Sequence, residues 1–131
     1  MRFKTLIIDD DPIATMLLNK KLDLNGDGDI PLLFENGQQG IDYITSQPPN
    51  QNYLIFLDIH MPILDGWQFL QGLQSQNSTN NYFIYVTSSS VNPVEIQQAD
   101  KFPEVVNFLS KPITHEQITQ CKNLINRLKS A

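Results

Sequence analysis

The segment 54–66 constrains the fold of this chain most, because a short apolar run in it ends in a single carboxylate. Residues 54–57 are all apolar, without alternating polar positions, which is typical of a strand buried on both faces of a parallel sheet. Asp58 follows directly, and a loop with Pro62 and an Asp-Gly pair comes next. Ligands of open α/β sheets bind at the carboxyl ends of the strands. We therefore expect Asp58 to lie in a functional site, provided that other strands end beside it.

Four further apolar runs along the chain have the length of strands, and each is followed by a segment with helical periodicity. The predicted strands are 3–8, 31–35, 54–57, 82–86 and 105–109. Residues typical of helix caps open the predicted helices, namely Asp11, Asn36, Asp65, Asn92 and Thr114. Strict alternation of strand and helix predicts an α/β fold, with a parallel sheet covered by helices on both faces. The proline at the start of the second strand places that strand at a sheet edge.

Apolar residues at helical spacing predict which helix faces meet the sheet. The first helix has such a face at Ala14, Leu17, Leu18 and Leu22, and the last has one at Ile118, Cys121, Ile125 and Leu128. The helix that begins near Asn92 is mostly polar, with apolar contacts expected only from Ile96, Ala99 and Phe102. We expect this fourth helix to be held more loosely than the others.

Composition excludes several classes of protein. The chain has 131 residues, enough for one domain, and a net charge of −5, which disfavours binding to nucleic acid. A single cysteine rules out an internal disulfide and suits a reducing compartment. No signal-peptide pattern and no apolar run of about 18 residues is present. We therefore expect a cytoplasmic protein without a membrane partner.

Polar side chains follow four of the five predicted strands. Asp9 and Asp10 follow the first strand, Asp58 the third, Thr87 the fourth and Lys111 the fifth. Three carboxylates at one edge repel one another, so we expect them to hold a hard cation, for which Mg²⁺ is suited. The hydroxyl and the ammonium could then bind oxygens of a phosphoryl group, with Asp58 as the nucleophile.

This set of residues resembles the receiver domain of two-component response regulators, and the resemblance covers nearly the whole chain. The matching motifs are Ile7–Pro12, Leu57–Pro62 with Asp65–Gly66, Val86–Ser88 and Phe108–Pro112. The resemblance implies a flavodoxin-like (βα)5 three-layer sandwich, with a five-stranded parallel sheet of order 2-1-3-4-5. It also implies one receiver domain over residues 1–131, without an output domain.

The resemblance assigns roles to the acidic residues. Asp58 would accept a phosphoryl group from a histidine kinase or a phosphotransfer protein, and the chain would signal rather than act as an enzyme on other substrates. Asp10, Asp58 and the backbone carbonyl of His60 would bind Mg²⁺, with Asp9 acting mainly through a bound water. The family more often has asparagine at the position of His60.

The resemblance also assigns a switch. Thr87 and Lys111 would bind the phosphoryl oxygens, and Phe108 stands where the family more often has a tyrosine whose ring changes position. Phosphorylation would then alter the face made by the fourth helix, the fifth strand and the last helix, which would contact a downstream protein. Whether the chain forms a homodimer stays open.

Two other functions are consistent with parts of this pattern. A small phosphatase of the haloacid-dehalogenase type also uses an aspartate nucleophile, and the acidic triplet 9–11 could mimic its Asp-x-Asp signature. That family needs another acidic motif late in the chain, and only Glu116 is acidic after Lys111. A receiver-like binding module without phosphorylation is the other alternative, and the intact carboxylates, threonine and lysine argue against it.

A calcium loop is a weaker interpretation of the segment 23–30. Its Asp, Asn and Gly residues match the first eight positions of an EF-hand loop, but the twelfth position is Phe34 instead of a glutamate. A strand is predicted where the EF-hand requires a helix. We therefore expect a turn rich in Asp, Asn and Gly at this place.

Overall fold

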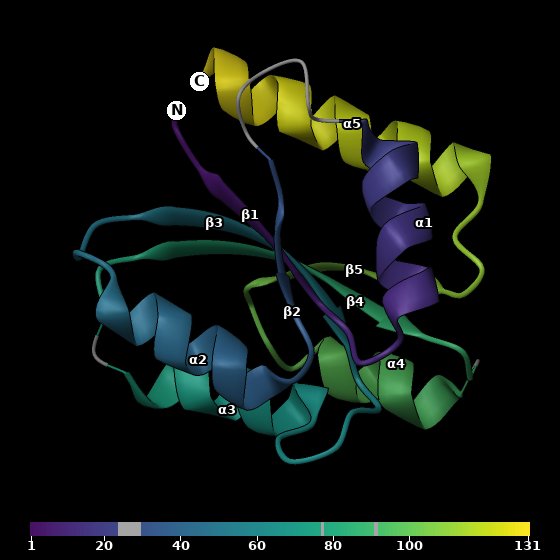
Figure 1. The fold of residues 1–131 in the computed structure, drawn as a ribbon, viewed down its shortest axis with the longest axis horizontal. Coiled ribbons are helices and arrows are strands. Elements are labelled where there is room, and N and C mark those ends of the chain that lie inside the picture. Colours follow the sequence, from purple (N-terminus) through teal and green to yellow (C-terminus); the bar gives the residue numbers. More distant parts are fainter. Residues whose placement is uncertain (24–29, 77, 91) are drawn as a thin grey trace.

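The computed structural model describes residues 1–23, 30–76, 78–90 and 92–131, which form five strands alternating with five helices (Figure 1). The strands are β1 (Lys4–Ile8), β2 (Leu32–Phe34), β3 (Asn52–Asp58), β4 (Asn81–Ser88) and β5 (Val105–Ser110). The helices are α1 (Pro12–Leu22), α2 (Gly37–Ser46), α3 (Gly66–Ser75), α4 (Pro93–Ala99) and α5 (His115–Ser130). All strand pairs are parallel, in the order β2-β1-β3-β4-β5. The predicted α/β class, strand order and edge position of β2 are confirmed.

The sheet is the middle layer of three. Helices α1 and α5 cover one face, and α2, α3 and α4 cover the other (Figure 1). Successive strand residues point to opposite faces, so Ile7 and Phe56 pack in the core under α1 and α5. Their neighbours Ile8 and Leu57 pack in the core under α2 and α3. The continuous apolar runs of β1 and β3 thus contribute side chains to the hydrophobic cores on both faces of the sheet.

Strand β3 lies at the centre of the sheet, and its register fixes the position of Asp58. Residues 53–57 are at most 1% exposed, as predicted for a strand buried on both faces. Leu57 pairs with Ile8 of β1 and with Val86 of β4, so these three strands end within two residues of one another. Asp58 is the next residue and pairs with Thr87.

The predicted helix caps are present and fix where α1, α3 and α5 begin. The Asp11 side chain accepts a hydrogen bond from the Ile13 N–H at 2.9 Å. Complete capping boxes open α3 and α5, formed by Asp65 with Gln68 and by Thr114 with Gln117.

Three details of the sequence prediction are wrong. Leu17 is 46% exposed, and Thr15 is buried in the inward row of α1 together with Leu18 and Leu22. Ile96 is also exposed, at 37%, because short α4 buries only Ala99 completely. Strand β4 extends past Val86 to Ser88, since its last residues still pair with β5.

Two further sequence expectations concern a calcium loop and membrane spans. The calcium-like segment overlaps residues 24–29, which lie outside the described part of the chain. Before them, α1 ends at Leu22, and its C-cap residue Asp23 has the left-handed conformation. No helix in the described part has the length and apolar character needed to cross a membrane.

Candidate functional site

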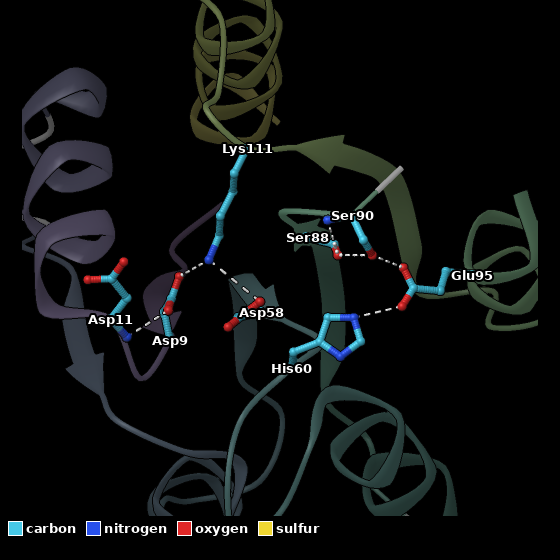
Figure 2. A network of polar contacts seen from close by, with 8 residues as sticks. All are labelled: Asp9, Asp11, Asp58, His60, Ser88, Ser90, Glu95 and Lys111. Carbon is cyan, nitrogen blue, oxygen red and sulfur yellow. Dashed lines mark hydrogen bonds and ion pairs between the residues drawn. The ribbon is translucent and has the colours of Figure 1, made fainter. Parts of the chain in front are cut away.

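The polar residues at the strand ends meet at one edge of the sheet. Asp58 ends β3 and Thr87 lies beside it in β4, while Asp9 and Asp10 follow β1 and Lys111 follows β5. Carboxylate oxygens of the three aspartates lie within 4.8 Å of one another. Figure 2 shows Asp9, Asp58 and Lys111 converging between α1 and the loop after β3. Strands β1, β3, β4 and β5 each bring to this edge the side chains that the sequence predicted there.

Lys111 links the acidic residues. Its Nζ donates to Asp9 Oδ2 at 2.7 Å and lies 3.5 Å from Asp58 Oδ1. Burial lowers the pKa of the ammonium, but the hydrogen bond to Asp9 and the charges of both carboxylates outweigh it, so the pKa is raised. Lys111 therefore carries a positive charge beside Asp58 throughout the neutral range. Its backbone N–H donates to the Ser88 carbonyl at 2.8 Å, which ties this segment to β4.

Asp9 and Asp10 have different surroundings. Asp9 is buried, and its second oxygen accepts the Asp11 backbone N–H at 2.9 Å, so protein donors occupy both of its oxygens. Asp10 is exposed, and no described residue donates a hydrogen bond to its carboxylate. Asp10 is therefore freer than Asp9 to bind a ligand directly.

Asp58 is a buried carboxylate in an acidic environment. It is 5% exposed, and burial, together with the charge of Asp9, raises its pKa from 3.8 to about 6. The charge of Lys111 and the hydrogen bond from the His60 backbone N–H lower the pKa, but only in part. The positive charge of Lys111 thus compensates only in part for the burial of the ionised group and its repulsion by Asp9.

These residues fit a magnesium ion. Mg²⁺ binds through a few carboxylates, keeps several waters and favours phosphate oxygens as further ligands. Three carboxylate oxygens within 4.8 Å, one of them on Asp58 with its raised pKa, supply such ligands. A divalent cation would offset the mutual repulsion of the carboxylates. The His60 imidazole does not join this cluster, because its Nε2 contacts Glu95 at 2.7 Å.

Thr87 and Phe108 lie on neighbouring strands. Thr87 is 3% exposed, and its carbonyl accepts the Ile59 N–H at 3.1 Å, which holds the start of the β3–α3 loop against β4. Phe108 pairs with Val86, the residue before Thr87, and its ring is half-buried against the core under α2 and α3. Thr87 and Phe108 thus lie one register position apart on adjacent strands.

Gly66 lets the start of α3 pack against the backbone of Asp58 and Ile59, a role that sequence reasoning missed. A Cβ atom at Gly66 would lie 2.7 Å from the Asp58 carbonyl oxygen and 2.8 Å from Ile59 Cα. Real side chains do not tolerate such distances to backbone, so only glycine lets α3 start this close to the end of β3. The Asp-Gly pair in the sequence indicated a turn, and it gave no sign of this close approach.

Sequence reasoning also missed Glu95. This residue of α4 contacts His60 and the Ser90 hydroxyl, and Ser90 contacts Ser88 (Figure 2). A glutamate in the first turn of a polar helix is ordinary in sequence, so no signal could have identified it.

A cavity of about 370 Å³ opens beside the site. Asp9, Thr87 and Lys111 of the site line this cavity, together with apolar side chains of α1 and of the segment after β5, among them Ile13 and Ile113. Lys111 and Asp9 are thus open to this cavity beside α1.

The chain is similar in sequence to a known protein family and to individual known proteins. The model of the response regulator receiver domain family matches residues 5–122. A protein of Rhizobium etli named probable chemotaxis protein CheY is 29% identical over 117 residues, which cover 89% of this chain and 87% of that protein. The peroxide stress-activated histidine kinase mak3 of Schizosaccharomyces pombe is 30% identical over 121 residues, 88% of this chain but only 5% of the kinase.

Solved structures show the same fold. A Francisella response regulator receiver domain superposes with a TM-score of 0.75 at 21% identity and covers 98% of this chain and 99% of its own. The N-terminal domain of an uncharacterized protein from Wolinella succinogenes gives a TM-score of 0.77 at 23% identity, with coverages of 98% and 97%. These likenesses concern the fold.

Proposed function

Since the chain belongs to the response regulator receiver domain family, we propose that Asp58 accepts a phosphoryl group from a histidine kinase or a phosphotransfer protein. Residues 1–131 would act as one receiver domain in this reaction. The observation that carries the proposal is the convergence of Asp9, Asp10, Asp58 and Lys111 at one sheet edge. Family membership favours a signalling phospho-acceptor over the phosphatase interpretation.

The chemistry follows from the charges of the site. An Asp58 oxygen attacks the phosphorus, the bond between phosphorus and the donor nitrogen breaks, and an acyl phosphate forms. With a pKa of about 6, Asp58 is mostly ionised at neutral pH and can act as the nucleophile. Lys111, 3.5 Å from Asp58 Oδ1, would neutralise charge on the transferred oxygens.

Magnesium would be held by Asp10, Asp58 and the His60 carbonyl, with Asp9 acting through a water. When bound, it would offset the negative charge of the carboxylates and of the incoming phosphoryl oxygens. Both carboxylate oxygens of Asp9 already accept hydrogen bonds from the protein, whereas Asp10 is exposed. These observations support a direct metal contact for Asp10 and an indirect one for Asp9.

The surface beside the site supports a protein as the phosphoryl donor. Ile13 is 64% exposed and Leu17 is 46% exposed, and both border the cavity that leads to Lys111. Apolar side chains grouped at the entrance of a site suit burial by a protein partner. A donor seated there would present its phosphoryl group to Asp58 from the side of α1.

Phosphorylation would act on the face formed by α4, β5 and α5. Thr87 would move toward the phosphoryl oxygens and leave space that the half-buried Phe108 ring could fill. Phe108 has no hydroxyl to hydrogen-bond, so burial of its ring would favour this arrangement. The exposed Val106 of β5 would contribute apolar surface for a downstream protein.

Beryllofluoride, which stands in for a phosphoryl group, tests the proposal. We expect it to bind only when Mg²⁺ is present and to change the fluorescence of Trp67, which is next to Gly66 and stacks on Phe102 with 6.3 Å between ring centroids. Asp58→Asn should abolish the response, while Asp42→Asn, which changes a carboxylate away from the site, should keep it. A full response from Asp58→Asn would refute the proposal.

A further inference from the structure

Glu95 joins α4 to two loops at the phosphorylation site. Its Oε1 lies 2.7 Å from His60 Nε2, and its Oε2 accepts the Ser90 hydroxyl at 2.9 Å (Figure 2). The Glu95 side chain is only 12% exposed, although it carries a carboxylate. A carboxylate that is largely covered and uses both oxygens holds its partners more firmly than an exposed one does.

Both partners of Glu95 are connected to the proposed acceptor. His60 is two residues after Asp58, and its backbone N–H is hydrogen-bonded to the Asp58 carboxylate. The Ser90 N–H donates to Ser88 Oγ at 3.1 Å, and Ser88, 0% exposed, directly follows Thr87. The Glu95 contacts thus lead from α4 to both sides of the site.

Helix α4 has few other attachments near its start. It has seven residues, of which only Ala99, at its end, is fully buried. Val94 is 66% exposed and Ile96 is 37% exposed, so the first turn contributes little apolar burial. Among the described residues, the contacts of Glu95 are the main side-chain link between this turn and the rest of the domain.

We propose that Glu95 is a positioning residue that holds α4 against the phosphorylation site in the unphosphorylated protein, and that phosphorylation releases this hold. The inference rests on the proposed function of Asp58. Movement of Thr87 toward a phosphoryl group displaces Ser88, and with it Ser90. A hydrogen bond of 2.9 Å is lost when its partner moves away by about an ångström, so α4 is freed when the loop moves.

The proposal predicts the direction in which loss of the Glu95 contacts changes binding at the phosphorylation site. Contacts that exist only in the unphosphorylated arrangement oppose activation, since a ligand shifts an equilibrium only by its differential affinity for the two states. Their removal therefore favours the activated arrangement. A merely structural role would give the opposite sign, because damage to the site weakens binding there.

Glu95→Gln tests this inference. The amide keeps the shape of the side chain but removes its charge and one acceptor oxygen. We expect half-saturation with beryllofluoride and Mg²⁺ at about fivefold lower concentration, the low end of typical coupling between sites. Amide NMR signals of α4 should move toward their activated positions even without beryllofluoride. Ser90→Ala, which leaves the charge in place, should give a smaller change in the same direction.

Glu116→Gln is the matched control, because it removes the same charge from an exposed position in the first turn of α5. It should bind beryllofluoride like the wild type. Unchanged or weaker binding by both Glu95→Gln and Ser90→Ala would overturn the inference, while normal binding by the wild type would leave the role of Asp58 intact. Absence of binding by the wild type would overturn both.

Discussion

The raised pKa of Asp58 predicts that its ionised carboxylate destabilises the metal-free protein, and replacement by asparagine tests this directly. The carboxylate is 5% exposed and lies with Asp9 and Asp10 in one cluster. Burial and the charge of Asp9 raise its pKa to about 6, against an ordinary value of 3.8. In the Asp58→Asn variant, an amide would fill the same space without a charge, so the repulsion and the burial of charge both disappear.

The pKa shift of Asp58 gives the sign and the size of its effect on the free energy of unfolding. A group whose pKa is raised on folding stabilises the protein fully below its unfolded pKa, and this stability is lost as the pH rises through the folded pKa. For Asp58 this window runs from 3.8 to about 6. A change of one in pKa corresponds to about 1.4 kcal/mol, so the loss is about 3 kcal/mol at neutral pH. We expect Asp58→Asn to recover about 3 kcal/mol, because the net pKa shift already includes the attraction of Lys111.

Urea denaturation from about pH 4 to about pH 7, with a chelator present, measures this difference. The free energy of unfolding of Asp58→Asn should exceed that of the wild type at neutral pH, and the two curves should converge at the acidic end. Asp42→Asn, at a position away from the site, should follow the wild type throughout. A difference that is absent at neutral pH, or that grows on acidification, would refute this view of the site.

Three further changes test the roles of neighbouring residues. Asp10→Ala should weaken Mg²⁺ binding more than Asp9→Ala, measured by Trp67 fluorescence titration, and the reverse order would exchange their roles. Thr87→Ala should bind beryllofluoride yet lose most of the NMR shift changes on the α4–β5–α5 face; an unchanged shift pattern would disprove the switch. Gly66→Ala should lower stability by about 2 kcal/mol and slow phosphorylation, because its Cβ would press on the backbone behind the acceptor; normal stability would contradict this.

The fold could be predicted well from the sequence because its signals are local and repeated. Continuous apolar runs such as that of β3 indicate strands buried on both faces, and the cap residues Asp65 and Thr114 mark helix starts. Parallel strands bring their carboxyl ends to one edge, so the juxtaposition of Asp9, Asp58 and Lys111 also follows from topology.

What the sequence could not predict depends on contacts between distant segments. Leu17 has the spacing of a core residue, but α1 turns it toward the cavity beside the site. Glu95 and His60 are far apart in the sequence and meet only because α4 packs beside the β3–α3 loop. Gly66 owes its role to the approach of α3 to β3, a distance that no local pattern contains.

Site-specific phosphorylation tests the central claim most directly. The protein should be incubated with a small acyl phosphate donor with and without Mg²⁺, its intact mass measured, and the acyl phosphate trapped by borohydride reduction before peptide mapping. We expect the added mass of one phosphoryl group only with Mg²⁺, with the trapped product at Asp58 and none in Asp58→Asn. Labelling at another residue, or equal labelling of Asp58→Asn, would contradict the account.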